Sequence, residues 1–149
     1  MILSTVFDGE SREVGRIFAS IAREVHRSQR PLEKPCALIG GGETSVTLEK
    51  NFGRGGPNQE FVVSAILSLG GQTGFCVVGL DTDGTDGRPA AAGAMADAST
   101  VAAAGNRGVN LHDALGYHRA LPALSSLDEI ITTGQTGTNV NDLKFFIAT

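Results

Sequence analysis

The chain has 149 residues, 41% of them hydrophobic, which suits one globular domain with a buried core. Twelve Lys and Arg against sixteen Asp and Glu give a formal net charge of -4. No basic run is long enough to follow a phosphate backbone, so we expect no nucleic-acid partner. The N-terminus lacks a signal-peptide pattern and no apolar stretch approaches a membrane span. We therefore expect a cytoplasmic protein that does not enter a membrane.

The first third of the chain predicts one helix and a pair of strands. Residues 11–27 place apolar side chains on one helical face, with Ser11 or Asp8 as the cap. Residues 36–39 and 44–48 predict two strands on either side of a turn made by three glycines.

Helix and strand signals then alternate. Pro57 suits the first position of a helix over residues 57–69. Residues 75–80 (FCVVGL) are continuously apolar, which predicts a strand buried on both faces. Alanine dominates residues 90–105 and favours another helix there.

The C-terminal part adds a short helix at residues 110–117 and late strands at residues 129–132 and 144–148. Helices interleaved with buried strands predict an α/β fold. We expect a layered mixed sheet with flanking helices and glycine-rich loops at the strand ends, where such folds place ligands.

The segment Gly53 to Glu60 (GRGGPNQE) has the features of an anion site. Glycines let the backbone approach a ligand, a helix from Pro57 offers unpaired N–H groups, and Arg54 is a bidentate donor for phosphate or carboxylate. It matches neither common phosphate-binding glycine pattern, so a turn with a solvated arginine is the alternative. The neighbouring GGGETS (residues 40–45) gives weaker support, since any turn between strands needs glycine.

Asp81, Asp83 and Asp86 lie together in DTDGTDG, directly after the strand at residues 75–80. Carboxylates on a flexible loop suit Mg²⁺, and one of them could accept a proton from a substrate hydroxyl. The glycine spacing excludes an EF-hand loop. A turn built from Asp and Gly alone is the alternative interpretation.

A third polar loop, Gly134 to Asp142 (GQTGTNVND), holds more small hydrogen-bonding side chains than a turn needs, which suits a polar ligand or a domain seam. The three histidines show no metal spacing, and we expect them at the surface or at helix ends. Both cysteines lie in apolar runs without CxxC spacing, which favours reduced core residues.

Four motifs together resemble a known family. GGGETSVTL, GRGGPNQEF, DTDGTDGRPAAAGA and TGQTGTNVNDL, in this order and at these separations, are similar to the C-terminal MOFRL domain of bacterial-type glycerate 2-kinases, a family also labelled hydroxypyruvate reductase. The resemblance covers almost the whole chain. Residues 1–34 correspond to a lead-in segment with a helix and a proline-containing linker, and residues 35–149 to the MOFRL-like domain.

The resemblance implies an enzyme that transfers the γ-phosphoryl group of ATP, with Mg²⁺, to the 2-hydroxyl of glycerate, giving 2-phosphoglycerate. Such transfer depends on positioning and charge neutralisation. It implies catalytic roles for Arg54, Asp83 and Asp86, and metal binding by Asp81 and Asp83. The implied substrate- and nucleotide-binding residues are Gly42, Glu43, Thr44, Gly53, Gly55, Gly56, Asn58, Glu60, Thr136, Thr138, Asn139, Asn141 and Asp142.

Members of this family are longer, with an N-terminal α/β domain that contributes a catalytic lysine and half of an interdomain cleft. The resemblance therefore implies that the chain acts with such a domain or a partner chain, and that alone it is weakly active or inactive. Pro57 stands where members commonly have a second arginine. A homo-oligomer is compatible with the sequence.

Two other functions stay open. The older family label implies an NAD(P)H-dependent hydroxypyruvate reductase, but no strand here is followed by the GxGxxG fingerprint of dinucleotide binding. The second is a non-catalytic module that binds a ligand or a partner.

Overall fold

The computed structural model describes residues 1–48, 51–87 and 91–149. Its strands form one mixed sheet in the order β1-β2-β6-β3-β4-β5. β1 and β2 are parallel, and all other neighbours are antiparallel. The strand bounds are β1 (Ile2–Phe7), β2 (Cys36–Gly42), β3 (Phe75–Asp81), β4 (Gly93–Asp97), β5 (Ile130–Ile131) and β6 (Asp142–Ala148).

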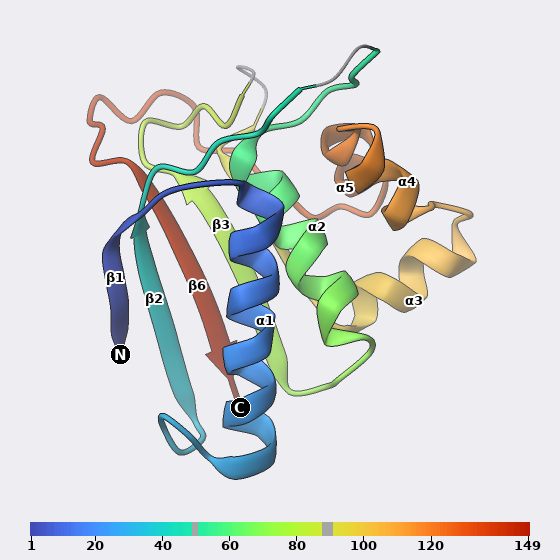
Figure 1. The fold of residues 1–149 in the computed structure, drawn as a ribbon. Coiled ribbons are helices and arrows are strands. Elements are labelled where there is room, and N and C mark those ends of the chain that lie inside the picture. Colours follow the sequence, from blue (N-terminus) through green and yellow to red (C-terminus); the bar gives the residue numbers. More distant parts are fainter. Residues whose placement is uncertain (49–50, 88–90) are drawn as a thin grey trace.

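Helices α1 (Ser11–Ser28) and α2 (Pro57–Leu69) lie in front of the strands in Figure 1 and pack on each other. Three shorter helices, α3 (Ala98–Asn106), α4 (Leu111–Gly116) and α5 (Ala120–Ser126), contact α2. The predicted fold class, a mixed sheet with flanking helices, is confirmed. Over the described residues, no helix is long and apolar enough to cross a membrane.

The core lies between the two long helices and the sheet. Phe18 of α1 and Phe61 of α2 meet edge to face with ring centroids 5.1 Å apart. Leu38 of β2 and Phe146 of β6 are buried beneath them. β1 and α1 belong to this same sheet and core, because β1 pairs with β2 and α1 packs on α2.

The three glycines at positions 40–42 belong to β2, so the predicted turn between two strands is wrong. β2 pairs with β6 along its whole length, as far as Gly42 opposite Asp142. A Cβ on Gly40 would lie 2.8 Å from the Phe18 ring, so the glycine admits the core aromatic rings. Residues 44–48 form no strand.

A strand replaces the first half of the alanine-rich helix predicted at residues 90–105. β4 pairs with β3, and this tertiary pairing outweighs the helix propensity of alanine. α3 begins only after Asp97, whose carboxylate accepts a hydrogen bond from the Ser99 N–H at 2.7 Å. α5 had no counterpart among the predicted elements.

The helix predicted over residues 57–69 is confirmed, and so is a strand at residues 75–80. The predicted burial of that strand on both faces is wrong, because only the face with Phe75 and Val77 is buried. The predicted cap of α1 is wrong, because Glu10 occupies the cap position without a side-chain hydrogen bond to the helix. Ser11 is instead buried, and its hydroxyl donates to Thr44 Oγ1 at 2.7 Å.

Candidate functional site

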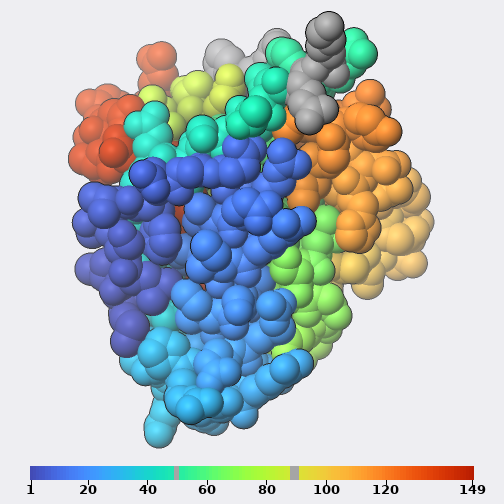
Figure 2. All heavy atoms as spheres, in the orientation of Figure 1, coloured from blue at the N-terminus to red at the C-terminus, as the bar shows by residue number. Residues whose placement is uncertain are grey.

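The glycine-rich and acidic loops gather at one end of the sheet. β6 runs antiparallel to β2 and β3, so its first residue, Asp142, lies beside their last residues, Gly42 and Asp81. Figure 2 shows the loops that follow β2 and β3 and the loop that precedes β6 meeting at the top of the molecule. Motifs that are far apart in the sequence thus form one surface.

Asp142 is the centre of a buried polar network. Its Oδ1 accepts from Asn58 Nδ2 at 2.8 Å, and its Oδ2 accepts from Lys144 Nζ at 2.9 Å and from the Thr44 N–H at 3.4 Å. Lys144 is 0% exposed and also donates to Asn58 Oδ1 at 3.2 Å. A buried ammonium needs such partners. The network ties β6, α2 and the loop after β2 together.

Asp86 caps α2 from the loop after β3. Its Oδ1 accepts from the Asn58 N–H and its Oδ2 from the Gln59 N–H, both at 3.0 Å. The side-chain amides of the same two residues also donate to this carboxylate, at 3.2 and 2.9 Å. These helix N–H groups are therefore satisfied within the chain, and the expectation that they are unpaired is wrong.

Burial raises the pKa of Asp86 to about 6, and the hydrogen bonds from Asn58 and Gln59 oppose this rise. The residue is 2% exposed and its carboxylate faces the helix. This placement differs from the expected contact with a metal or a substrate hydroxyl. It gives Asp86 the position of a residue that holds α2 and its preceding loop in place.

The GRGG loop is held on both sides by close backbone contacts. The Gly53 N–H donates to the Tyr117 carbonyl at 2.9 Å, and the Arg54 carbonyl accepts from the Leu121 N–H at 3.0 Å. A Cβ on Gly56 would lie 2.4 Å from the Asp86 side chain, so only glycine fits there. The loop is thus a fixed element of the site.

The Arg54 side chain is exposed. It lines a hollow of about 290 Å³ together with Leu121, Pro122, Ser125 and Ile130. An exposed guanidinium on a fixed loop is available to a phosphate or a carboxylate.

A second hollow, of about 330 Å³, is lined by glycines of the GRGG loop and by a buried pair of side chains. Glu60 Oε1 lies 2.8 Å from His118 Nδ1, and the two residues are 2% and 5% exposed. Glu60 Oε2 has no hydrogen-bond partner among the described residues. Burial raises the pKa of Glu60, and the hydrogen bond from His118 opposes this. The lining residues are Val46, Leu48, Phe52, Gly53, Gly55, Gly56, Pro57, Glu60, Gly87 and His118.

The loop after β3 and the loop before β6 form one unit. The Asp83 carbonyl accepts from the Thr136 N–H at 3.2 Å, and Asp83 Oδ2 accepts from Asn139 Nδ2 at 3.4 Å. The Asn141 carbonyl accepts from the Thr82 hydroxyl at 2.8 Å. Between the loops is a hollow of about 390 Å³ lined by Asp83, Thr85, Gln135, Gly137, Thr138 and Asn139.

The carboxylates suggested as metal ligands lie at the base of this loop pair. Asp81 Oδ1 accepts from the Asp83 N–H at 3.1 Å, and burial raises the pKa of Asp81. Within the described part of the chain, no three or more His, Cys, Asp or Glu side chains are grouped to hold a metal. Two carboxylates fit Mg²⁺ if phosphate oxygens and water complete its shell. Metal binding by Asp81 and Asp83 stays a prediction.

Three residues of the site were missed at the level of sequence: Gln59, His118 and Lys144. His118 lies between the ends of α4 and α5, which agrees with the expected helix end, but it is buried and not at the surface. Lys144 carried a readable signal, because in DLKFFIA it shares a strand face with Phe146. A lysine on a core-facing strand position predicts a buried charge pair. Among the expected binding residues, Glu43 is exposed, and its N–H donates to the Phe7 carbonyl at 2.9 Å.

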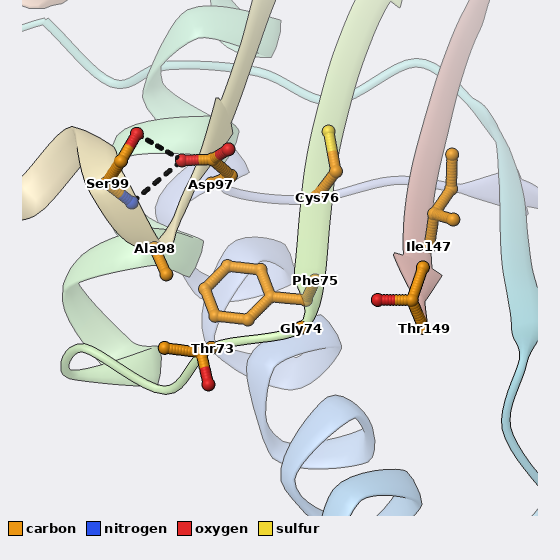
Figure 3. A pocket seen from close by; sticks show the side chains of 9 residues that line it. All are labelled: Thr73, Gly74, Phe75, Cys76, Asp97, Ala98, Ser99, Ile147 and Thr149. Atoms are coloured by element: carbon orange, nitrogen blue, oxygen red, sulfur yellow. Dashed lines mark hydrogen bonds between the residues drawn. The ribbon is translucent and has the colours of Figure 1, made fainter.

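A further hollow, of about 550 Å³, lies at the other end of the sheet. Figure 3 shows Cys76, Asp97 and Ile147 on three strands at its border. Asp97 there accepts hydrogen bonds from Ser99 that cap α3. None of the expected site residues lies in this hollow.

The chain is similar to proteins named as glycerate kinases. It is 45% identical to the D-glycerate 2-kinase of Thermotoga maritima over 142 residues. The aligned region covers 95% of this chain and 34% of the relative. It is 38% identical over 148 residues to the glycerate 2-kinase of Pyrococcus horikoshii, covering 99% of this chain and 33% of the relative. A putative hydroxypyruvate reductase of Agrobacterium vitis is 40% identical over 97% of this chain and 38% of the relative.

The fold of the chain is also similar to that of a glycerate kinase of known structure. The crystal structure of the glycerate kinase from Thermotoga maritima superposes with a TM-score of 0.96 and 43% identity over 100% of this chain and 36% of that chain. The chain thus spans about a third of the length of these relatives and corresponds to their C-terminal domain. The model of the MOFRL family matches residues 36–142, and the chain belongs to this family.

Proposed function

We propose that the chain is the C-terminal part of a cytoplasmic glycerate 2-kinase, which uses ATP and Mg²⁺ to convert glycerate to 2-phosphoglycerate. The observation that carries this proposal is the agreement in fold and sequence with glycerate 2-kinases over nearly the whole chain. Because the chain spans about a third of those relatives, an N-terminal domain must complete the cleft, and the chain alone is weakly active or inactive.

Arg54 and the acidic loop have separate tasks in this proposal. The exposed guanidinium of Arg54 binds a phosphate or the glycerate carboxylate. Asp81 and Asp83 hold Mg²⁺ jointly with nucleotide phosphates, and the ion neutralises charge on the transferred group. Thr136 and Asn139 fix the position of Asp83 through their hydrogen bonds to it.

The buried residues position these loops. Asp86 and Asn58 fix the start of α2 against the loop after β3, and Asp142 extends the network to β6. We propose that they act through this placement and not by contact with the reacting atoms. Transfer of a phosphoryl group is sensitive to such positioning.

The hollow above Glu60 and His118 is a candidate site for a hydroxyl group of glycerate or of the nucleotide sugar. Its size suits a small ligand, Glu60 is one of its lining residues, and Glu60 Oε2 has no hydrogen-bond partner among the described residues. A ligand hydroxyl would satisfy an acceptor that otherwise stays buried without a partner.

Reduction of hydroxypyruvate is the second candidate, because a relative carries that name. The absence of a dinucleotide fingerprint from this sequence weighs against it. A non-catalytic module would bind neither the nucleotide nor glycerate.

A fusion protein separates these candidates. It joins the N-terminal part of the Thermotoga maritima D-glycerate 2-kinase, up to the point where the similarity begins, to this chain. We expect MgATP and glycerate to raise its melting temperature, since a ligand at a hundred times its Kd adds about 2.7 kcal/mol of stability. Stabilisation by NADH in their place would favour the reductase, and stabilisation by none of the three would favour the non-catalytic module.

A further inference from the structure

The sheet has one face covered by helices and one face that the described residues of this chain leave bare. Along β6 the residues alternate between buried and more exposed positions, and β3 shows the same alternation. Phe146 and Val77 face the helices and are 3% and 1% exposed. Ile147 and Met95, which point the other way, are 41% and 47% exposed.

The bare face is apolar across four strands. Strand register places its members in rows, for example Ile39, Phe145, Val78 and Met95 side by side on β2, β6, β3 and β4. The hollow in Figure 3 lies at the lower end of this face, where Cys76 and Ile147 are neighbours. The apolar residues of the bare face are Ala37, Ile39, Cys76, Val78, Leu80, Met95, Leu143, Phe145 and Ile147, and Asp97 lies beside Cys76 at its lower edge.

This composition does not suit a face exposed to water. An antiparallel sheet with one solvated face normally alternates apolar and polar residues, whereas strands covered on both faces read as continuous apolar runs. FCVVGL in β3 and FFIA in β6 are of the second kind. None of the nine residues is among the described residues that pack against the core of the chain. A large apolar surface of this kind marks an interface.

We propose that the bare face is the docking surface for the polypeptide that the longer relatives carry N-terminal to this domain. The relatives have about twice as much additional chain as is present here, so a body large enough to cover the face exists in them. The face also ends beside Asp81 and Asp142 at the candidate site. One covering body can therefore bury the apolar rows and supply the second wall of the cleft. The inference rests on the proposed function only in naming the N-terminal part of the kinase as the polypeptide that covers the face.

Cys76 is a built-in probe of the bare face. Cys36, in contrast, packs against the core on the helix side. In a Cys36→Ala background, maleimide labelling of Cys76 is followed by mass spectrometry of its peptide, in the chain alone and in the fusion protein. We expect labelling to be at least about tenfold slower in the fusion protein, because the covering polypeptide excludes the reagent. Ser20→Cys, at an exposed position of α1, is the matched control and should label at the same rate in both proteins.

Equal labelling of Cys76 in the two proteins would overturn the inference. Protection of Cys76 in the chain alone, rising with protein concentration and accompanied by a dimer mass, would also overturn it, because the occupant would then be a second copy.

Val78→Thr offers an independent measurement. It should weaken the binding of the separately produced N-terminal part by at least about tenfold while the chain alone keeps its melting temperature. Neither the labelling nor the binding measurement depends on enzyme activity. The inference about the bare face can therefore fail while the proposed function stands, and the proposed function can fail while the inference stands.

Discussion

Asp86 Oδ1 lies 3.0 Å from the backbone nitrogen of Asn58, so a loop 28 positions along the chain provides the cap of α2. This bond joins two of the sequence motifs, GRGGPNQE and DTDGTDG, at one helix end. The Asn58 side chain in turn donates to Asp142, the last residue of the loop GQTGTNVND. Polar residues of the family motifs thus form hydrogen bonds with one another, and these buried hydrogen bonds hold the loops that carry the exposed groups.

Asp86→Asn should destabilise the chain by about 2 kcal/mol. Both carboxylate oxygens of Asp86 accept a backbone N–H, one from Asn58 and one from Gln59. In asparagine an NH₂ group replaces one of these oxygens, so one of the two buried N–H groups loses its acceptor. Urea unfolding measures the loss. Asp83→Asn is the matched control, because Asp83 lies at the hollow between the loops, and its stability should stay within about 0.5 kcal/mol of the parent. Equal effects of the two changes would contradict the capping role.

Acidification should stabilise the folded chain between neutral pH and pH 5. Burial raises the folded-state pKa of Asp86 to about 6, above its unfolded value of 3.8. Stability linked to a raised pKa is fully present below the unfolded value and is lost as the pH rises through the folded value. Asp86 alone should add about 1 kcal/mol at pH 5 relative to pH 7.5.

The pKa values of Glu60 and Asp81 are raised too and act in the same direction, whereas the lowered pKa of Asp97 acts only towards more acidic pH. Urea unfolding at the two pH values tests this prediction. Asp86→Asn should reduce the difference by about 1 kcal/mol. An unchanged difference in the variant would show that Asp86 does not titrate as described.

Lys144→Met should cost about 3 kcal/mol of stability, because it leaves the buried Asp142 carboxylate without its cation. In the double variant Lys144→Met with Asp142→Leu, the loss should be smaller than the sum of the two single losses, since the unpaired charge is gone. A double-mutant cycle by urea unfolding supplies these values. Additive losses would mean that the two residues do not stabilise each other.

Arg54→Ala should leave the stability of the chain within about 0.5 kcal/mol, because the side chain is exposed. In the fusion protein, the same change should lower kcat/KM for glycerate or for MgATP by about a hundredfold, the loss of one charge-assisted contact. Arg16→Ala, on the outer side of α1, is the matched control and should leave both constants unchanged. An unchanged kcat/KM in Arg54→Ala would assign the loop a structural role.

Local patterns predicted those elements whose environment is local. The bounds of α2 follow from Pro57 at the start and Gly70 after the last turn, and both signals lie in the sequence. β4 follows from pairing with β3, which no pattern within an alanine-rich segment reports. The glycines of β2 look like a turn in the sequence, because the groups that require Gly40 and Gly42 come from elsewhere in the chain. The rings of Phe7 and Phe18 require Gly40, and the backbone of Phe7 requires Gly42.

The site shows the same division. The motifs identified its loops, since glycine and aspartate clusters after strands mark them. The sequence did not show that Asp86 turns inward to α2 while Arg54 stays exposed, because both lie in similar glycine-rich contexts. His118 was missed, because a partner 58 positions away buries it and nothing near it in the sequence indicates this. Lys144 lies in an apolar strand segment. The alternation of side chains along a strand would have placed it on the same face as Phe146 and so predicted its burial.

The most direct test of the proposed function is the glycerate-dependent formation of ADP and 2-phosphoglycerate by the fusion protein with MgATP. The N-terminal part of the Thermotoga maritima relative alone and this chain alone serve as references. We predict that the fusion protein forms both products at a rate at least about a hundred times that of either part, because both walls of the cleft are then present. A folded fusion protein that forms neither product, or that instead oxidises NADH in the presence of hydroxypyruvate, would contradict the assignment.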